Sequence, residues 1–341
     1  MIIRMLIQRV SRIQNRHIYS ALLVLFIFFS AYLMRLIEPE TFDSYFNSLW
    51  WVMTTVTTVG YGDVSPTTTA GQIYAMTAVY IVGIGLMGLV IGYIVDAFQV
   101  YRKKKEEGKL AYKSEGHYII VNYTKRSKET IEELLHIHDD KEIVIIDEDL
   151  DKKPSTDDRI HFVSGNPAEH RTLHQSNIKK SHAVLIFAPD NMKNYSLADG
   201  QTLLIATTIE GLGKEENFEV YTIAEILNDQ HINAFQHADV DEFVTPYHMS
   251  ARLIAKSASY RSASEVFRQL TSSRYGNDIY SIRKKKHWKT YRDAYQDLLE
   301  SGATLLANGK EVGIAKKLNE PIPEQSELLI VCDQETYEAI K

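Results

Sequence analysis

The segment from Thr54 to Asp63 contains two glycines, so its main chemical groups are exposed backbone amides and carbonyls. It reads TTVTTVGYGD. Threonine and valine favour extended backbone, whereas Gly60 and Gly62 admit backbone angles that residues with side chains resist. The overlapping segment upstream, FNSLWWVMTT, has the composition of a short apolar helix. A helix that gives way to such a loop indicates a use for exposed backbone groups, and the surrounding elements decide what that use is.

Two apolar segments flank this loop, and each is long enough to cross a bilayer. The first, Ile18 to Ile37, contains one charge, Arg35, and the second, Gln72 to Val95, contains none. About 20 apolar residues suffice to cross a membrane as a helix. A signal peptide does not fit the first segment, because its apolar core is too long and no small-residue cleavage site follows. The sequence therefore predicts two transmembrane helices.

The charges around these helices predict their orientation. Four arginines and no acidic residue precede the first helix, and YRKKK follows the second, whereas acidic residues dominate between them. Because positive flanks stay in the cytoplasm, we expect a multi-pass protein of the cell membrane with both termini cytoplasmic. Residues 1–17 also mix apolar residues with the arginines. This pattern fits either an amphipathic helix on the inner membrane surface or a basic tail that only fixes topology.

The segment between the two helices contains an ion-channel signature. FNSLWWVMTT is too short to span a membrane, and irregular backbone at membrane depth persists only when it is buried in protein or lines a watery cavity. A re-entrant pore loop meets that condition. Within it TVGYG, Thr58 to Gly62, resembles the selectivity signature of potassium channels. The chain resembles a two-transmembrane prokaryotic potassium channel.

This resemblance implies roles for the loop. Carbonyl oxygens and the threonine hydroxyl would replace the water around K⁺, the permeant ion, and one chain supplies only one wall of such a cage. The resemblance therefore implies a homotetramer. The K⁺ ligands would come from Thr58, Val59, Gly60 and Tyr61, the filter would end at Gly62, and Trp50, Trp51 and Asp63 would support it. Trp50 and Trp51 would pack around Tyr61; alternatively, they anchor the chain at the membrane interface.

Glycines in the second apolar segment predict how it bends and packs. Gly83 matches the position where inner helices of the family bend, and we expect it to be a gating hinge. Gly88 and Gly92 lie four residues apart, a spacing that suits close helix packing. Thr54 stands where many relatives carry a glutamate, so inactivation behaviour does not follow from the resemblance.

Composition changes after the second apolar segment. Residues 1–107 carry 9 basic and 7 acidic residues, net +2, whereas residues 108–341 carry 29 and 37, net −8. The acidic C-terminal part argues against nucleic-acid binding. Cys332 is the only cysteine, so no intrachain disulfide can form, in keeping with a reducing compartment. We expect a lipid bilayer around the first part and water around the second.

Strand and helix patterns alternate in the C-terminal part and predict a parallel sheet covered by helices. With SGNPAEHRTL from Ser164 and TPYHMSARLIAKS from Thr245, this part resembles an RCK (TrkA-N/TrkA-C-like) domain, which regulates K⁺ conductance. The resemblance implies a Rossmann-like lobe and a small α+β lobe. The expected domains are a helical membrane pore domain at 1–107, a linker at 108–116, the Rossmann-like lobe at 117–245, crossover helices at 246–273 and the C-terminal lobe at 274–341.

The regulatory ligand stays open at this point. The turn NYTKRS after the first strand lacks the glycines of a dinucleotide fingerprint, which argues against an intact NAD site, but Asp147 at the end of the second strand could contact another nucleotide. A divalent cation is the alternative, because calcium-gated relatives use an acidic cluster here. Of its expected positions Glu225 is retained, whereas Asn166 and Leu227 replace acids.

We therefore expect a K⁺-selective channel gated by its cytoplasmic RCK ring through the linker, and no enzyme, because no catalytic constellation is present. Two other classes compete with this interpretation. A membrane-tethered nucleotide-binding oxidoreductase conflicts with NYTKRS and with the complete TVGYG signature. A subunit of a K⁺ uptake transporter would use isolated glycines and four pore loops per chain. Additional soluble RCK subunits remain a possible partner.

Overall fold

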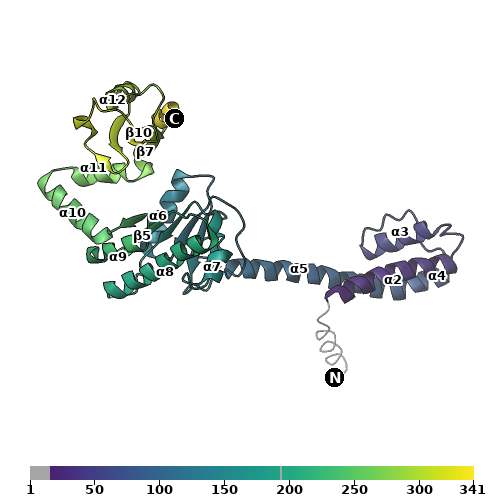
Figure 1. Cartoon of the computed structure of the whole chain (residues 1–341). Helices are drawn as coiled ribbons and strands as arrows, with labels where there is room; N and C mark the ends of the chain where they lie inside the picture. Colours follow the sequence, from purple (N-terminus) through teal and green to yellow (C-terminus); the bar gives the residue numbers. More distant parts are fainter. Residues whose placement is uncertain (1–15, 193) are drawn as a thin grey trace. The chain divides into compact units, whose positions relative to one another are not determined.

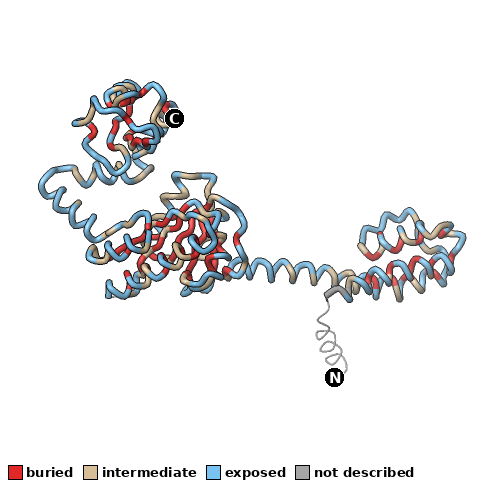
Figure 2. The backbone as a smooth tube through the Cα atoms, viewed as in Figure 1, coloured by how far each residue is buried: buried red, intermediate tan, exposed pale blue. Residues whose placement is uncertain are grey.

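The computed structural model describes residues 16–192 and 194–341 and divides the chain into two compact units, Met1–Lys104 and Lys105–Lys341 (Figure 1). The basic segment interpreted above as an amphipathic helix or tail lies almost wholly outside the described residues. Buried residues gather within each unit, most densely on the strands of the second (Figure 2).

The first unit is helical. Its elements are α2 (Arg16–Ile37), α3 (Tyr45–Val56), α4 (Thr69–Tyr74), the π-helix η1 (Ala75–Gly83) and α5 (Ile84–Glu106). Two apolar helical stretches, Ser20–Ile37 and Thr69–Glu106, are long enough to cross a membrane, and α3 between them is not. The predicted pair of spanning helices and the short helix between them are thus both present.

The second spanning helix runs from Thr69 to Glu106, so it extends beyond the predicted segment Gln72–Val95 at both ends. It also differs in its middle. It begins at Thr69 rather than Gln72, because the Thr68 side chain caps it by accepting the Gly71 amide. Residues Ala75–Gly83 are π-helical, which the sequence pattern did not indicate. Nearby, the Thr77 hydroxyl donates to the Ile73 carbonyl at 2.7 Å, a bond that competes with the backbone ladder.

The second unit contains a six-stranded parallel sheet in the order β3-β2-β1-β4-β5-β6. This is the doubly wound order of Rossmann-like folds, so the predicted fold class is confirmed. The strands are β1 (Tyr118–Val121), β2 (Ile143–Asp147), β3 (Ile160–Ser164), β4 (Ala183–Ile186), β5 (Thr222–Glu225) and β6 (Glu242–Val244).

Alternate strand residues face two different helix layers. On one face Ile120 and Ile145 pack with Ile131 of α6 (Lys125–Ile137). On the other face Ile119 and Val144 pack with residues of α7 (His170–Gln175), α8 (Tyr195–Glu216) and α9 (Ile232–His237). Because both faces are covered, the strands read as continuous apolar runs, which is why they could be predicted from sequence.

The predicted linker is docked on the sheet unit rather than free. The Ser164 amide donates to the Gly108 carbonyl at 3.1 Å, Tyr112 donates to the Gln175 carbonyl at 2.8 Å, and Gly116 donates to the Lys180 carbonyl at 2.8 Å. Gly108 has φ +65°, and a Cβ there would lie 2.5 Å from the Ser164 nitrogen. This close approach requires glycine, so the position of the linker is specified along its length.

The crossover segment forms two helices, α10 (Pro246–Ser259) and α11 (Ala263–Leu270), separated where Ser262 adopts φ +70°. The C-terminal lobe is an antiparallel sheet, β7-β10-β8-β9, packed around Trp288. Its elements are β7 (Asn277–Arg283), α12 (Tyr291–Glu300), β8 (Thr304–Asn308), β9 (Glu311–Val312), β10 (Glu327–Asp333) and α13 (Gln334–Ile340). The predicted α+β lobe is present, and α13 is an element that the sequence pattern did not indicate.

Candidate functional site

The loop Thr58–Gly62 follows the short helix α3 directly. Thr58, Gly60 and Gly62 have positive φ angles of 62°, 55° and 75°, so every second residue is left-handed. The amides of Val59 and Gly60 both donate to the Thr54 carbonyl, at 2.8 and 3.0 Å. A β-branched residue at positive φ is strained, and the loop therefore depends on its surroundings for this shape.

Trp50 supplies the support that the loop needs. Its indole Nε1 donates to Asp63 Oδ2 at 2.8 Å, and its ring stacks on Tyr61 with centroids 5.6 Å apart and planes 3° apart. Trp51, the next residue of α3, is buried against Phe42, with ring centroids 5.4 Å apart. Within one chain, therefore, Trp50 contacts both Asp63 and Tyr61, and Trp51 lies in the helical core; the predicted supporting roles of all three residues stay predictions.

A buried carboxylate that the sequence analysis used only for topology joins the two spanning helices. Glu38, 2% exposed, follows α2 and accepts bonds from the amides of Thr67 and Thr68 at 3.0 and 2.9 Å, and from both hydroxyls at 3.3 and 2.5 Å. A Cβ at Gly71 would lie 2.0 Å from Glu38 Oε1, so glycine leaves room for this carboxylate. The sequence did contain a signal for this contact, namely an acidic residue at the end of one apolar helix and a Thr-Thr pair before the next.

Those donors also control the charge of Glu38. Burial alone would raise the pKa of its carboxyl, but hydrogen bonds from Thr68, Thr67 and Thr41 outweigh it and lower the pKa to about 2. The carboxylate is therefore ionised at any physiological pH. It fixes residues 67 and 68, which connect the loop to the second spanning helix.

Gly83, the predicted hinge, ends the π-helical stretch and is tightly packed. A Cβ there would lie 2.7 Å from Val56 Cγ2 and 3.0 Å from Phe26 Cε1. Gly88 and Gly92 would meet nothing within 4 Å in the same chain. The hinge role of Gly83 stays a prediction, and close packing against the end of α3 now has a specific geometric basis.

In the second unit, Asp147 lies at the carboxyl end of β2, where ligands of open α/β sheets bind. Its Oδ2 accepts the Tyr123 amide at 2.7 Å, and its Oδ1 accepts the amides of Asp149 and Leu150 at 2.8 and 3.2 Å. A carboxylate has about four acceptor positions, so the main chain uses most of them. With no glycine in the turn after β1, these residues do not fit a dinucleotide.

Glu225 at the end of β5 is also occupied by the chain itself. Its side chain is 7% exposed, and Arg126 Nε lies 2.5 Å from Oε1. Arg126 Nη2 and the Ala188 amide both donate to Oε2, at 3.1 and 2.9 Å. A nearly buried carboxylate requires a compensating cation, and Arg126 provides it.

The three candidate ligand residues do not form one site within the chain. Asn166 follows β3, next to Asp147, whereas Glu225 is separated from β3 by four strand spacings, or about 19 Å. Asn166 Oδ1 accepts the Ala168 amide at 2.8 Å, and Leu227 is buried with Ala188. Within residues 16–192 and 194–341, no group of three or more His, Cys, Asp or Glu could hold a metal ion. These residues do not fit a calcium ion.

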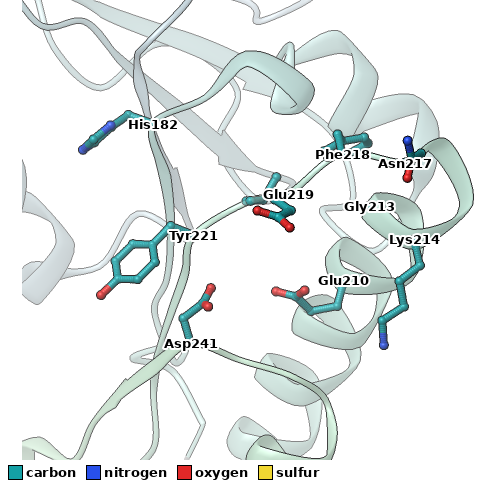
Figure 3. A pocket seen from close by; sticks show the side chains of 10 residues that line it. His182, Glu210, Gly213, Lys214, Asn217, Phe218, Glu219, Tyr221 and Asp241 are labelled. Atoms are coloured by element: carbon teal, nitrogen blue, oxygen red, sulfur yellow. The ribbon is translucent and has the colours of Figure 1, made fainter. Parts of the chain in front are cut away.

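An open acidic pocket of about 860 Å³ lies at the amino ends of β4, β5 and β6, away from the residues described above (Figure 3). The carboxylates of Glu210 and Asp241 point into the same space, and the Thr222 hydroxyl donates to Glu210 Oε1 at 2.6 Å. Burial raises the pKa of the Glu210 carboxyl, the Thr222 bond opposes this, and the negative charge of Asp241 adds to the rise. The two carboxylates therefore disfavour each other's charged form.

Comparison with known families matches both units. Residues 3–106 match the family described as ion transport protein, and residues 118–246 match the TrkA-N domain. One part of the chain is thus similar to ion transport proteins and the other to TrkA-N domains. The resemblance inferred from TVGYG and the alternating strands, a potassium channel with an RCK-type domain, is thus confirmed.

Two curated relatives have names that describe potassium channels. YugO of Bacillus subtilis is 30% identical over 212 residues, which are 62% of this chain and 62% of YugO. The calcium-gated potassium channel TvoK of Thermoplasma volcanium is 29% identical over 253 residues, 73% of this chain and 70% of TvoK. The chain thus spans less than two thirds of YugO.

Among solved structures, the GsuK channel bound to NAD is similar with a TM-score of 0.49 and 14% identity, over 94% of this chain and 57% of that chain. GsuK bound to ADP is similar with a TM-score of 0.45 and 16% identity, over 67% of this chain and 59% of that chain. These likenesses are too weak to indicate a ligand for this chain.

Proposed function

We propose that this protein is a K⁺-selective ion channel of the cell membrane that assembles from four copies. The observation that carries the proposal is the Thr58–Gly62 loop, which combines three left-handed residues with the Trp50–Asp63 and Trp50–Tyr61 contacts. Such a loop presents carbonyl oxygens in place of the hydration shell of K⁺. The names of the relatives support the same ion.

Four copies are required because one chain exposes the loop on one side only. Val59 and Tyr61 are 54% and 67% exposed in the single chain. Many apolar residues of α2 and α5 are also exposed. Symmetric assembly around an axis would place the loops opposite one another and bury part of this surface. The basic flanks orient both termini toward the cytoplasm.

A flux assay on the full-length protein in liposomes tests the ion. We expect uptake of Rb⁺ driven by a K⁺ gradient, with Na⁺ excluded, and loss of the K⁺ preference in a Gly60→Ala variant, because φ +55° at this position disfavours a side chain. Gly88→Ala, which meets no atom in the chain, is the matched control. Equal permeability to Na⁺ and K⁺ would contradict the proposal, and absence of any flux would favour a transporter subunit.

We further propose that the TrkA-N unit gates the pore through the docked linker at 108–116. The linker bonds to the sheet unit at Gly108, Tyr112 and Gly116 and continues directly from α5. A change of shape in the sheet unit would therefore move the end of α5. A ligand can drive this only if it binds one shape better than the other.

The two linker glycines provide a controlled test. Both have positive φ, but a Cβ at Gly108 would lie 2.5 Å from the Ser164 nitrogen, whereas a Cβ at Gly116 would meet only the end of the Lys141 side chain, at 3.6 Å. Gly108→Ala should undock the linker and change open probability in single-channel records without changing ion selectivity. Gly116→Ala introduces the same backbone strain and should change gating far less. Equal effects from both variants would contradict coupling through the docked linker.

A further inference from the structure

The point where a Rossmann-like lobe holds a ligand phosphate is the amino end of the helix after its first strand. In this chain that helix is α6, which begins at Lys125 after the Thr124 cap. It starts between the carboxyl ends of β1 and β4, where the strand order changes direction. A phosphate site here would use the first helix amides and a nearby basic side chain.

Asp190, from the loop between β4 and α8, already lies at that point. Its Oδ2 accepts the Lys125 amide at 2.8 Å, and its Oδ1 lies 2.8 Å from Arg126 Nη1. A helix amide and a guanidinium converging on two oxygens are the groups that proteins use to bind phosphate. Here both groups bind a carboxylate of the same chain.

The neighbouring amides are also already bonded, and the neighbouring charges are negative, so neither favours a bound phosphate. The Tyr123 amide is bonded to Asp147, and the Thr124 amide is bonded to the Ser127 hydroxyl. The adjoining cavity, about 290 Å³, is lined by Asp147, Glu148, Asp149 and Asp190. A diphosphate entering it would meet carboxylates where a dinucleotide site offers amides.

We propose that Asp190 is a built-in anion that fills the phosphate position of the TrkA-N unit and closes it to phosphate-bearing ligands. The side chains of Asp190 and Arg126 are each 35% exposed, so the barrier is electrostatic and not steric. Removing this one carboxylate would free the Lys125 amide and one arm of Arg126 for a phosphate. This proposal concerns ligand binding and does not depend on K⁺ conduction.

Binding of ADP, without added divalent cations, tests the proposal on the full chain in detergent by isothermal titration calorimetry. The wild-type protein should bind ADP weakly or not at all. Asp190→Ala should bind it at least tenfold more tightly, and inorganic pyrophosphate should displace it. Asp190→Asn keeps the size of the side chain and removes its charge, so it should show a smaller gain in the same direction and serves if the alanine variant does not fold.

Asp149→Ala is the matched control, because it removes the same charge from the same cavity at an exposed residue, whereas Asp190 is the carboxylate that holds the Lys125 amide and Arg126. It should gain much less affinity than Asp190→Ala, and Arg126→Gln combined with Asp190→Ala should abolish the gain. Tight ADP binding by the wild-type protein, an equal gain in Asp149→Ala, no gain in either Asp190 variant, or bound ADP that pyrophosphate cannot displace would each overturn the proposal.

Discussion

Glu38→Gln is the perturbation whose outcome the structure predicts most sharply. Each carboxylate oxygen of Glu38 accepts one amide and one hydroxyl, from Thr67 on one side and Thr68 on the other. Glutamine has the same size, but its NH₂ group cannot accept a hydrogen bond. One backbone amide would then face a donor in a buried site, whereas the threonine hydroxyl beside it can rotate and accept from the NH₂ group.

Two observations set the size of the effect. A buried donor without a partner costs about 1–3 kcal/mol. Independently, lowering the Glu38 pKa from 4.5 to about 2 corresponds to about 3 kcal/mol, an upper figure because solvent near the membrane surface screens the charge. We expect a loss of about 2 kcal/mol in the local opening free energy at residues 67–68, or about 30-fold faster amide exchange.

Hydrogen exchange read by mass spectrometry on a peptide covering residues 65–72 measures this directly. Because folding lowers the pKa, the stabilisation is fully present above about pH 4.5 and is lost as pH falls toward 2, so the comparison belongs at pH 7. Glu40→Gln, at an exposed carboxylate on the same connection, is the control and should exchange like the wild type. Unchanged exchange in Glu38→Gln would refute the reasoning.

Three further variants test other contacts. Trp50→Phe keeps a ring on Tyr61 but removes the bond to Asp63, so the K⁺ over Na⁺ preference from reversal potentials should fall severalfold. Gly83→Ala should destabilise the channel in detergent, and adding Val56→Ala should restore stability if packing explains Gly83; a hinge would leave gating impaired in the double variant. Glu210→Gln should raise the free energy of unfolding at pH 7 by up to about 1 kcal/mol, read as a higher unfolding temperature. Folding raises the Glu210 pKa, so at pH 7 the fold holds a carboxylate charge that it disfavours. That gain should vanish below about pH 4, and its persistence there would count against burial as the cause.

Elements that depend on the composition of one short segment could be predicted from the sequence. A bilayer demands about 20 apolar residues, and a sheet buried on both faces demands continuous apolar strands, so both spanning helices and a helix-covered parallel sheet could be predicted. The loop Thr58–Gly62 could also be located, since Gly60 and Gly62 admit the positive φ that its backbone adopts. Trp50 and Asp63 could be named but not paired.

Which polar groups already have partners depends on contacts between segments far apart in the sequence. Glu38 bonds residues about 30 positions away, and Arg126 pairs with Glu225 across 99 positions. A sequence pattern shows that a carboxylate exists near a strand or helix end but not which donor reaches it. Asp147 and Glu225 therefore read as available to a ligand in the sequence, and Asp190 attracted no attention. In the fold they are taken by amides and a guanidinium of the same chain, because a buried charge is stable only where the packing of distant segments brings it a partner.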